Sequence, residues 1–198
     1  IGLYPDIGAA HFLQRCPGEL GMFLALTGLR LRTAGLYYCN LVTHTIPSER
    51  LGRLTPESLS IDNMTTRTAD ISKLQPAIDL CFGLNSVDAI VTALENRNDP
   101  GSTDSLNLLR RCSPTSLKVT FEHMKRMRRK GLADVLKEDW RISRHMMAET
   151  EFFEGVRAVL IERDNAPKWN PPALSAVSEA NINRYFEKLP DEPDLDLK

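Results

Sequence analysis

The stretch IGLYPDIGAAHFLQRCPG, residues 1–18, contains the pattern that decides the fold. Pro5 fixes the backbone immediately before Asp6, and small residues follow closely. An Asp ahead of a short apolar run is typical of a helix N-cap. The stretch therefore predicts a short helix capped by Asp6 and broken by the Pro17–Gly18 pair.

The bulk composition limits the classes of protein that the chain can belong to. Of its 198 residues, 42% are hydrophobic and 26% are charged, which is enough for a packed core. A net charge of -1 argues against nucleic acid as a partner, because phosphate binding requires a basic surplus. No stretch approaches the roughly 20 apolar residues of a membrane span. The first residues also lack the basic region of a signal peptide, so we expect no targeting segment in this chain.

Cysteine and histidine spacing gives no sign of a metal site. No CxxC pair occurs, so a zinc ribbon or thioredoxin-like motif is disfavoured and we expect reduced, mostly buried thiols. None of the histidines has a second ligand at a usable spacing, so each is expected to be a surface or core residue. The residues concerned are Cys16, Cys39, Cys81, Cys112, His11, His44, His123 and His145.

Apolar residues at helical spacing dominate most of the chain and predict about nine helices. Residues 19–28 are apolar almost all round, which predicts a deeply buried helix ended by Gly28. Ser86 and the Ser113–Pro114 pair are start signals for two later helices. The polar stretch 48–73 lacks a period and is expected to be a surface loop. Thr33 is predicted to cap a third helix, and Gly131 is predicted to end the helix that starts at Ser113–Pro114. Asp99–Gly101 is predicted to stop one helix, with the next starting at Ser102. A later helix is predicted to bury Val156, Val159 and Leu160.

Residues 41–47, LVTHTIP, are predicted to be the one strand of the chain. A lone strand cannot satisfy its backbone groups, so its partner strand would have to lie elsewhere. The chain also begins without Met. Together these features predict that the chain is the C-terminal part of a larger protein.

Four segments resemble the crotonase (enoyl-CoA hydratase/isomerase) superfamily. Within it, the Asp in YPDIG, the phrase SPTSLK and the ending EGVRAVLIERDNAPKWNPP resemble the 3-hydroxyisobutyryl-CoA hydrolase branch more than the hydratases. The segments are IGLYPDIGAAHFLQRCPGELGMFLALTG (1–28), LRTAGLYYCNLVTHTIPSERL (31–51), CSPTSLKVTFE (112–122) and FFEGVRAVLIERDNAPKWNPP (152–172).

This resemblance implies an α/β crotonase (ClpP/crotonase-like) fold. The chain would hold mainly the α-helical C-terminal part of that fold, with about one core strand. Residues 1–54 would be the end of the crotonase core and residues 55–85 a variable loop or insertion. Residues 86–188 would form a helical cap region, and residues 189–198 a flexible acidic tail.

The resemblance also implies hydrolysis of an acyl-CoA thioester, with 3-hydroxyisobutyryl-CoA of valine breakdown as the substrate. Asp6 would be the catalytic residue carried over, and both Asp6 and Gly8 would border the substrate. No metal or redox cofactor is implied, since CoA is part of the substrate, and the relatives are mitochondrial. The family's Gly-rich oxyanion segment and its Glu, expected just before Ile1, are not among these residues, so the chain is not expected to work alone.

Other interpretations stay open at this point. Asp6 could only cap a helix, and the protein could be an enoyl-CoA hydratase or isomerase. The chain could also be a non-catalytic helical binding module, or could self-associate through an exposed interface. A basic run between positions 118 and 130 could bind the phosphates of CoA or could be a solvated helix face. Its members are Lys118, Lys125, Arg126, Arg128, Arg129 and Lys130.

Overall fold

A computed structural model describes residues 1–53, 55, 70–190 and 193–197 of the chain. This part is built of helices and contains no strand. Two short 3-10 helices, η1 (Ser48–Arg53) and η5 (Leu174–Ala176), and one π-helix, η4 (Arg157–Ile161), accompany the α-helices. The α-helices are α1 (Ala9–Leu13), α2 (Leu20–Thr27), α3 (Thr33–Tyr38), α4 (Asp70–Phe82), α5 (Val87–Glu95), α6 (Pro100–Arg110), α7 (Pro114–Arg126), α8 (Leu132–Met147), α9 (Glu151–Val156) and α10 (Glu179–Arg184).

Helix α2 lies inside the larger hydrophobic core, where it packs against α1, α4, α6 and α7. Almost every residue of α2 is buried, which confirms the prediction from its all-round apolar sequence. Phe23 on α2 meets Phe82 on α4 edge to face, with ring centroids 5.1 Å apart. Gly28 ends the helix with a φ of 61°, as predicted.

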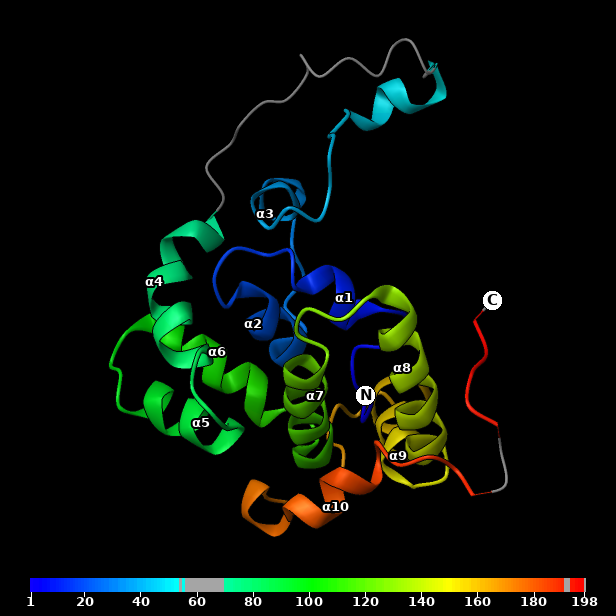
Figure 1. Ribbon diagram of the computed structural model, residues 1–198. Coiled ribbons are helices and arrows are strands. Elements are labelled where there is room, and N and C mark those ends of the chain that lie inside the picture. Colours follow the sequence, from blue (N-terminus) through cyan, green and yellow to red (C-terminus); the bar gives the residue numbers. More distant parts are fainter. Residues whose placement is uncertain (54, 56–69, 191–192, 198) are drawn as a thin grey trace.

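Helix α7 lies between two groups of helices (Figure 1). Helices α4, α5 and α6 lie on one side of it, and α8 and α9 lie on the other. On the second side a smaller core forms between the N-terminal segment, α7, α8 and α10, and it includes Tyr4, Val119, Ile142 and Tyr185. This smaller core supports the turn that carries Asp6.

The predicted serine caps are confirmed. The side chains of Ser86 and Ser113 each accept a hydrogen bond from the backbone N–H three residues further on, at 3.1 and 3.0 Å. Asp99 makes the same bond at 2.9 Å and so caps α6, which starts at Pro100 rather than at Ser102. Asp and Pro, taken from the sequence as a stop, are here the start signal of the next helix.

The predicted core strand at residues 41–47 is wrong. This segment is irregular backbone between α3 and η1, and Thr43 and His44 are exposed on it. No strand among the described residues pairs with it, and without a partner an extended segment has no hydrogen-bond ladder. β propensity mainly expresses packing against neighbouring strands, so β-branched residues alone were a weak guide.

Several predicted boundaries also need correction. Thr33 is the first residue of α3 and not its cap. Part of the predicted loop 48–73 is helical, since η1 occupies its start and α4 begins at Asp70. Residues 54 and 56–69 of that loop lie outside the described residues. Helix α7 ends at Arg126, and Gly131 is the N-cap of α8.

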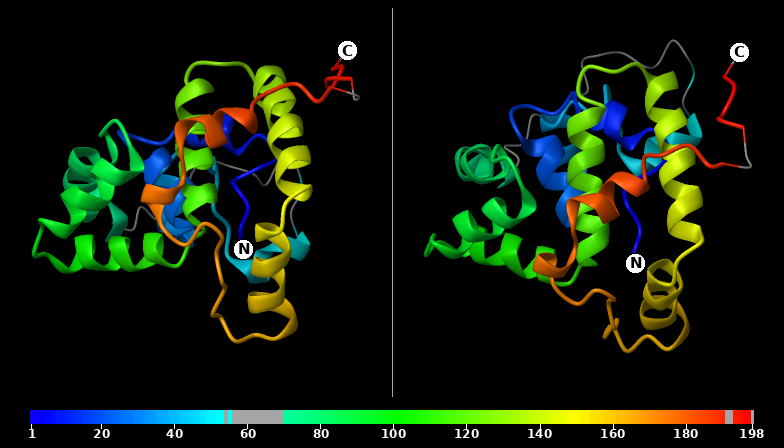
Figure 2. Two further views of the ribbon diagram at one scale, coloured as in Figure 1. Left: turned by 90° about the horizontal axis from the view of Figure 1, so that it is seen from below. Right: turned by 60° about the horizontal axis from the view of Figure 1, so that its bottom comes forward.

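The face of α9 and η4 is more exposed than predicted. These elements project from one end of the molecule (Figure 2). Val156 is half-buried, but Val159 and Leu160 are 40% and 56% exposed, so the prediction that they are buried is wrong. Helical spacing shows which residues share a face, whereas burial requires a neighbouring element, and none of those described covers this one.

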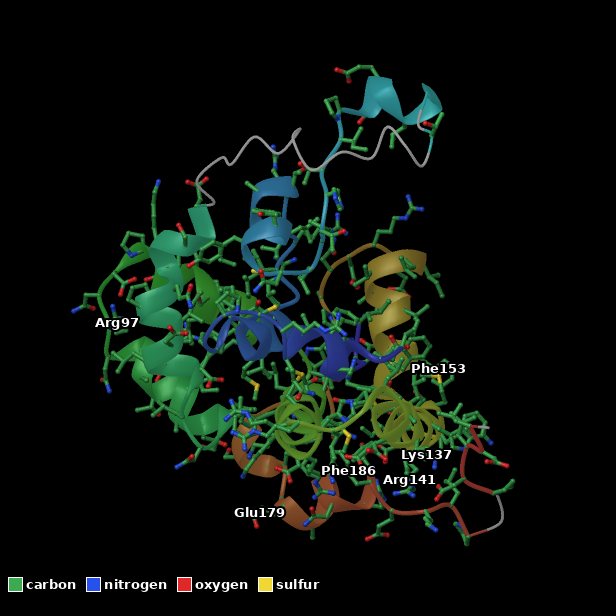
Figure 3. The ribbon with its side chains drawn as sticks, turned by 45° about the horizontal axis from the view of Figure 1, so that its top comes forward. Arg97, Lys137, Arg141, Phe153, Glu179 and Phe186 are labelled. Atoms are coloured by element: carbon green, nitrogen blue, oxygen red, sulfur yellow. The ribbon has the colours of Figure 1, made fainter. Side chains whose placement is uncertain are left out.

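The described part of the acidic tail is attached at one point. Arg141 on α8 donates two hydrogen bonds to the carboxylate of Asp194, at 2.8 and 2.6 Å, and Figure 3 shows Arg141 beside the C-terminal segment. The pair holds this carboxylate pKa at about 2. Among the residues described, no helix has both the length and the apolar character required to cross a membrane.

Candidate functional site

The site is built on the N-terminal segment, residues 1–5, which runs closely past α9. Gly2 has a φ of 69°, and a Cβ there would lie 2.3 Å from the carbonyl oxygen of Glu151. A Cβ on Gly155 would lie 2.2 Å from the carbonyl oxygen of Ile1. Glycine at both positions allows this close backbone approach, which fixes where the following residues lie.

Tyr4 connects the segment to α8. Its buried hydroxyl donates to the carbonyl oxygen of Asp139 at 2.8 Å and lies 2.9 Å from Oγ of Ser143. Burial, with contributions from the charges of Asp139 and Asp6, raises the pKa of Tyr4 far above its ordinary value. The hydroxyl therefore keeps its proton and remains a donor.

Asp6 begins a tight turn into α1. The N–H of Ala9 donates to the carbonyl oxygen of Asp6 at 3.1 Å, and Ile7 and Gly8 have φ values of 55° and 76°. Two successive positive φ values are typical of a type I′ turn. Ile7 is β-branched and 81% exposed, and this backbone costs such a residue about 1–2 kcal/mol.

The predicted side-chain cap of Asp6 is wrong. The N-cap of α1 is Gly8, and the Asp6 side chain makes no capping hydrogen bond. Within the described residues, the Asp6 carboxylate makes no hydrogen bond or ion pair, and the residue is half-buried at the surface of the turn. Its carboxylate is therefore available for chemistry rather than used in holding the helix.

Gly8 lies against α8. Its N–H donates to Oδ2 of Asp139 at 2.7 Å, and a Cβ there would lie 2.8 Å from Cδ1 of Leu132. The resemblance implies that Gly8 borders the substrate, but on this face a leucine side chain lies against Gly8. Contact between Gly8 and a substrate stays a prediction.

Asp139 also meets a buried histidine. Nε2 of His123, a residue 1% exposed, lies 3.0 Å from Oδ1 of Asp139 without the alignment of a hydrogen bond. Nδ1 of His123 lies 3.8 Å from Oε1 of Glu138. Burial lowers the pKa of His123, but the two carboxylates together outweigh burial and leave that pKa raised.

Sequence reasoning placed His123 only as a surface or core residue and did not single out Asp139. The two residues lie on different helices, so no spacing along the chain indicates that they meet. One signal was a charged residue within the apolar stripe of α8, because Asp139 lies at helical spacing between Val135 and Ile142, which are buried with it.

Three of the six members of the basic run form internal ion pairs. Lys118 pairs with Asp88 at 3.1 Å, and Arg128 pairs with Glu19 at 3.0 Å. Arg126 pairs with a neighbouring glutamate at 2.8 Å and lies 4.0 Å over the ring of Phe186, which Figure 3 labels beside α10. These contacts favour the solvated-face interpretation for three of its members.

Lys125 and Arg129 from the same run border a hollow of about 390 Å³ between α2, α7 and the end of α4. A second hollow of about 380 Å³ lies between α7 and α10 and shares Lys125 with the first. Neither hollow is lined by Asp6 or Gly8.

All four cysteines are free thiols. Three of them are buried and Cys112 is half-buried, which confirms the prediction of mostly buried thiols. In the part of the chain that is described, no three histidine, cysteine, aspartate or glutamate residues gather closely enough to hold a metal ion.

Comparison with known proteins gives the family. The model described as enoyl-CoA hydratase/isomerase matches residues 1–186. The chain belongs to the enoyl-CoA hydratase/isomerase family. This finding confirms the resemblance derived from the opening motif and the later segments.

Several relatives of this family member carry the name 3-hydroxyisobutyryl-CoA hydrolase. The mitochondrial protein of that name from Homo sapiens is 35% identical over 96% of this chain and 54% of its own length. The mitochondrial protein from Danio rerio is 36% identical over 100% of this chain and 56% of its own length. The chain therefore spans about half the length of the curated relatives that it matches.

Solved structures support the fold. A crystal structure of an enoyl-CoA hydratase from Rhodobacter sphaeroides superposes with a TM-score of 0.87 at 28% identity, covering 96% of this chain and 57% of the other. A carnitinyl-CoA dehydratase from Mycobacterium thermoresistibile gives a TM-score of 0.88 at 29% identity, covering 97% and 58%. The helices thus have the arrangement of part of a crotonase fold, while the predicted strand is absent from the described residues.

Proposed function

We propose that the protein carrying this chain hydrolyses an acyl-CoA thioester, with 3-hydroxyisobutyryl-CoA as the substrate and 3-hydroxyisobutyrate and CoA as products. The names of the relatives support this substrate. The observation that carries the proposal is the Asp6 carboxylate, which lies on a tight turn without a hydrogen bond or ion pair among the described residues.

Thioester hydrolysis needs an acidic group that can move a proton. Water oxygen bonds to the carbonyl carbon, the carbon–sulfur bond breaks, and the departing thiolate takes up a proton. In this proposal Asp6 exchanges that proton with the water or with sulfur at the acyl end of the substrate. Backbone N–H groups would hold the developing oxyanion.

Replacement of the carboxylate by an amide tests the role of Asp6. In the protein as the cell makes it, Asp6→Asn is expected to lower kcat for thioester cleavage by about 10²–10⁴-fold, because a positioned acid–base group contributes that much. KM should change little, since Asp6 would face the acyl end rather than the nucleotide of CoA. Free thiol release measures both constants.

The exposed Asp104 of α6 provides a matched control, and Asp104→Asn should leave kcat unchanged. Thioester cleavage at the wild-type rate by the Asp6→Asn protein would contradict the proposed role of Asp6.

Hydration or isomerisation of an enoyl-CoA is the second candidate. The description of the family model favours it, and one of the solved relatives is named an enoyl-CoA hydratase. The loss of absorbance of a 2-enoyl-CoA, measured beside thiol release on the same preparation, separates the two activities. Turnover of the enoyl-CoA with no thiol release would replace the hydrolase proposal.

The remaining expectations are also proposals. We infer that the substrate needs no metal or redox cofactor beside it, that the protein acts in mitochondria, and that this chain alone binds acyl-CoA without turning it over. Exposed apolar side chains on η4, including Leu160 and Ile161, would favour self-association. Light scattering after size-exclusion chromatography measures that association.

A further inference from the structure

We propose that Asp139 is a positioning residue for Asp6, because it holds the backbone segment before and after Asp6. In this proposal His123 in turn holds the Asp139 carboxylate. This inference rests on the proposed function, because it assigns importance to the geometry of Asp6. It concerns α7 and α8, which contribute no group to the hydrolysis described above.

Asp139 contacts the backbone segment before and after Asp6. Its carbonyl oxygen accepts the Tyr4 hydroxyl hydrogen bond at 2.8 Å, two residues before Asp6. Its Oδ2 accepts the Gly8 N–H at 2.7 Å, two residues after Asp6. Both bonds are buried, and a bond from an N–H to a charged carboxylate is among the stronger kinds. One residue of α8 thus fixes both ends of the five-residue stretch centred on Asp6.

The turn requires such a restraint. Ile7, between Asp6 and Gly8, is held at a φ of 55°, a backbone conformation that β-branched residues rarely adopt. Its side chain is mostly exposed, so packing does not hold it there. The bond from Gly8 to Asp139 is the contact next to Ile7 that keeps the turn in this form. Strain of this kind persists only where the surroundings enforce it.

His123 holds the Asp139 carboxylate in place within the protein. A buried carboxylate needs a partner, and the imidazole at 3.0 Å supplies one from α7. The groups that face His123 are Asp139 and Glu138 of α8 and the edge of the Tyr4 ring, whose centroid is 5.5 Å away. The four side chains therefore form one cluster between α7, α8 and the N-terminal segment.

The first arm of the test measures the turn itself and needs no enzymatic activity. Hydrogen exchange of the peptide spanning residues 4–12 is compared between the wild type and Asp139→Asn, in the protein as the cell makes it. The amide retains an acceptor for Gly8 but loses the charge, so exchange of this peptide should become at least tenfold faster. Asp134→Asn, an exposed acid on the same helix, is the control and should leave exchange unchanged.

The second arm measures thioester cleavage. Asp139→Asn should lower kcat by tenfold or more while KM stays within threefold, since the position of Asp6 changes and CoA binding does not. Adding Ile7→Asn should restore at least a third of the lost kcat, because asparagine adopts positive φ more readily than isoleucine does. Ile7→Asn alone should leave kcat near the wild-type value. A purely structural role for Asp139 would give no such rescue.

His123→Gln is the second variant, and its amide leaves a polar but uncharged group opposite the Asp139 carboxylate. It should produce a smaller acceleration of exchange in the same peptide.

Wild-type exchange in both variants would overturn the positioning role. Faster exchange with unchanged kcat would also overturn it, because the turn would then not control Asp6. A wild-type protein that releases no thiol refutes the proposed function. The hydrogen-exchange measurement would still test whether Asp139 holds the turn around Asp6.

Discussion

Ile7 combines three properties that together identify a strained residue. Among the described non-glycine residues with positive φ, Ile7 is the β-branched one, and it is 81% exposed. It follows the residue proposed to act on the substrate. Backbone strain beside the carboxylate proposed to act on the substrate is consistent with a turn selected for position rather than for stability.

Relief of this strain should stabilise the protein. Ile7→Asn is expected to raise the free energy of unfolding by about 1 kcal/mol, because asparagine tolerates the left-handed region and little apolar burial is lost. Urea denaturation followed by circular dichroism measures the change. Phe12→Asn on α1, an exposed apolar residue outside the turn, is the control and should not stabilise. A destabilised Ile7→Asn protein would show that the isoleucine side chain has a packing role.

At the scale of elements, α7 connects the two cores, and a buried polar contact lies at its start. Ser113 is buried, caps α7 through its Oγ, and donates from the same Oγ to Oε2 of Glu151 at 2.5 Å. Burial raises the pKa of Glu151, and the hydrogen bond from Ser113 opposes that rise. One hydroxyl thus ties the start of α7 to the start of α9.

Loss of this hydroxyl should cost more than loss of an ordinary cap. Ser113→Ala is expected to lower the free energy of unfolding by about 2–3 kcal/mol, because a cap is lost and a buried carboxylate loses its donor. Ser86→Ala, which removes a cap without a buried acidic partner, should cost about 1 kcal/mol. Urea unfolding of both variants at pH 7 compares the two losses. Equal losses would mean that the bond to Glu151 adds nothing.

At the scale of the whole molecule, the contact between α7 and α8 should make stability depend on pH. His123 of α7 faces Asp139 and Glu138 of α8 and the Tyr4 ring of the N-terminal segment. Its pKa is raised above 6.5, so the pairing contributes stability that is complete below pH 6.5 and is lost as the pH rises through the folded-state pKa.

The melting temperature should therefore fall as the pH rises above 6.5. In His123→Gln this dependence should be weaker, since glutamine does not titrate. Scanning calorimetry between pH 6 and 9 measures both proteins. His145, half-buried in the last turn of α8, is not part of this cluster and provides the control variant His145→Gln, which should keep the wild-type dependence. The same slope in wild type and His123→Gln would exclude His123 as the titrating group.

The sequence by itself determined the family, the buried helix α2 and the starts of α5 and α7. Each of these depends on residues close together in the chain: the motif around Asp6, the all-round apolar run, and a serine three residues before the N–H that it caps. Local patterns suffice where the physical interaction is local.

Only the tertiary structure decided the fate of residues 41–47, the exposure of Leu160 and the surroundings of Asp6. A strand exists only with a partner strand, and a helix face is buried only under a neighbouring element. Asp6 does not cap α1, because the N-cap position is occupied by Gly8. The bond from Gly8 to Asp139 joins residues 131 positions apart along the chain, and His123 reaches the same carboxylate from another helix. Such contacts depend on how helices pack, which no spacing along a single helix encodes.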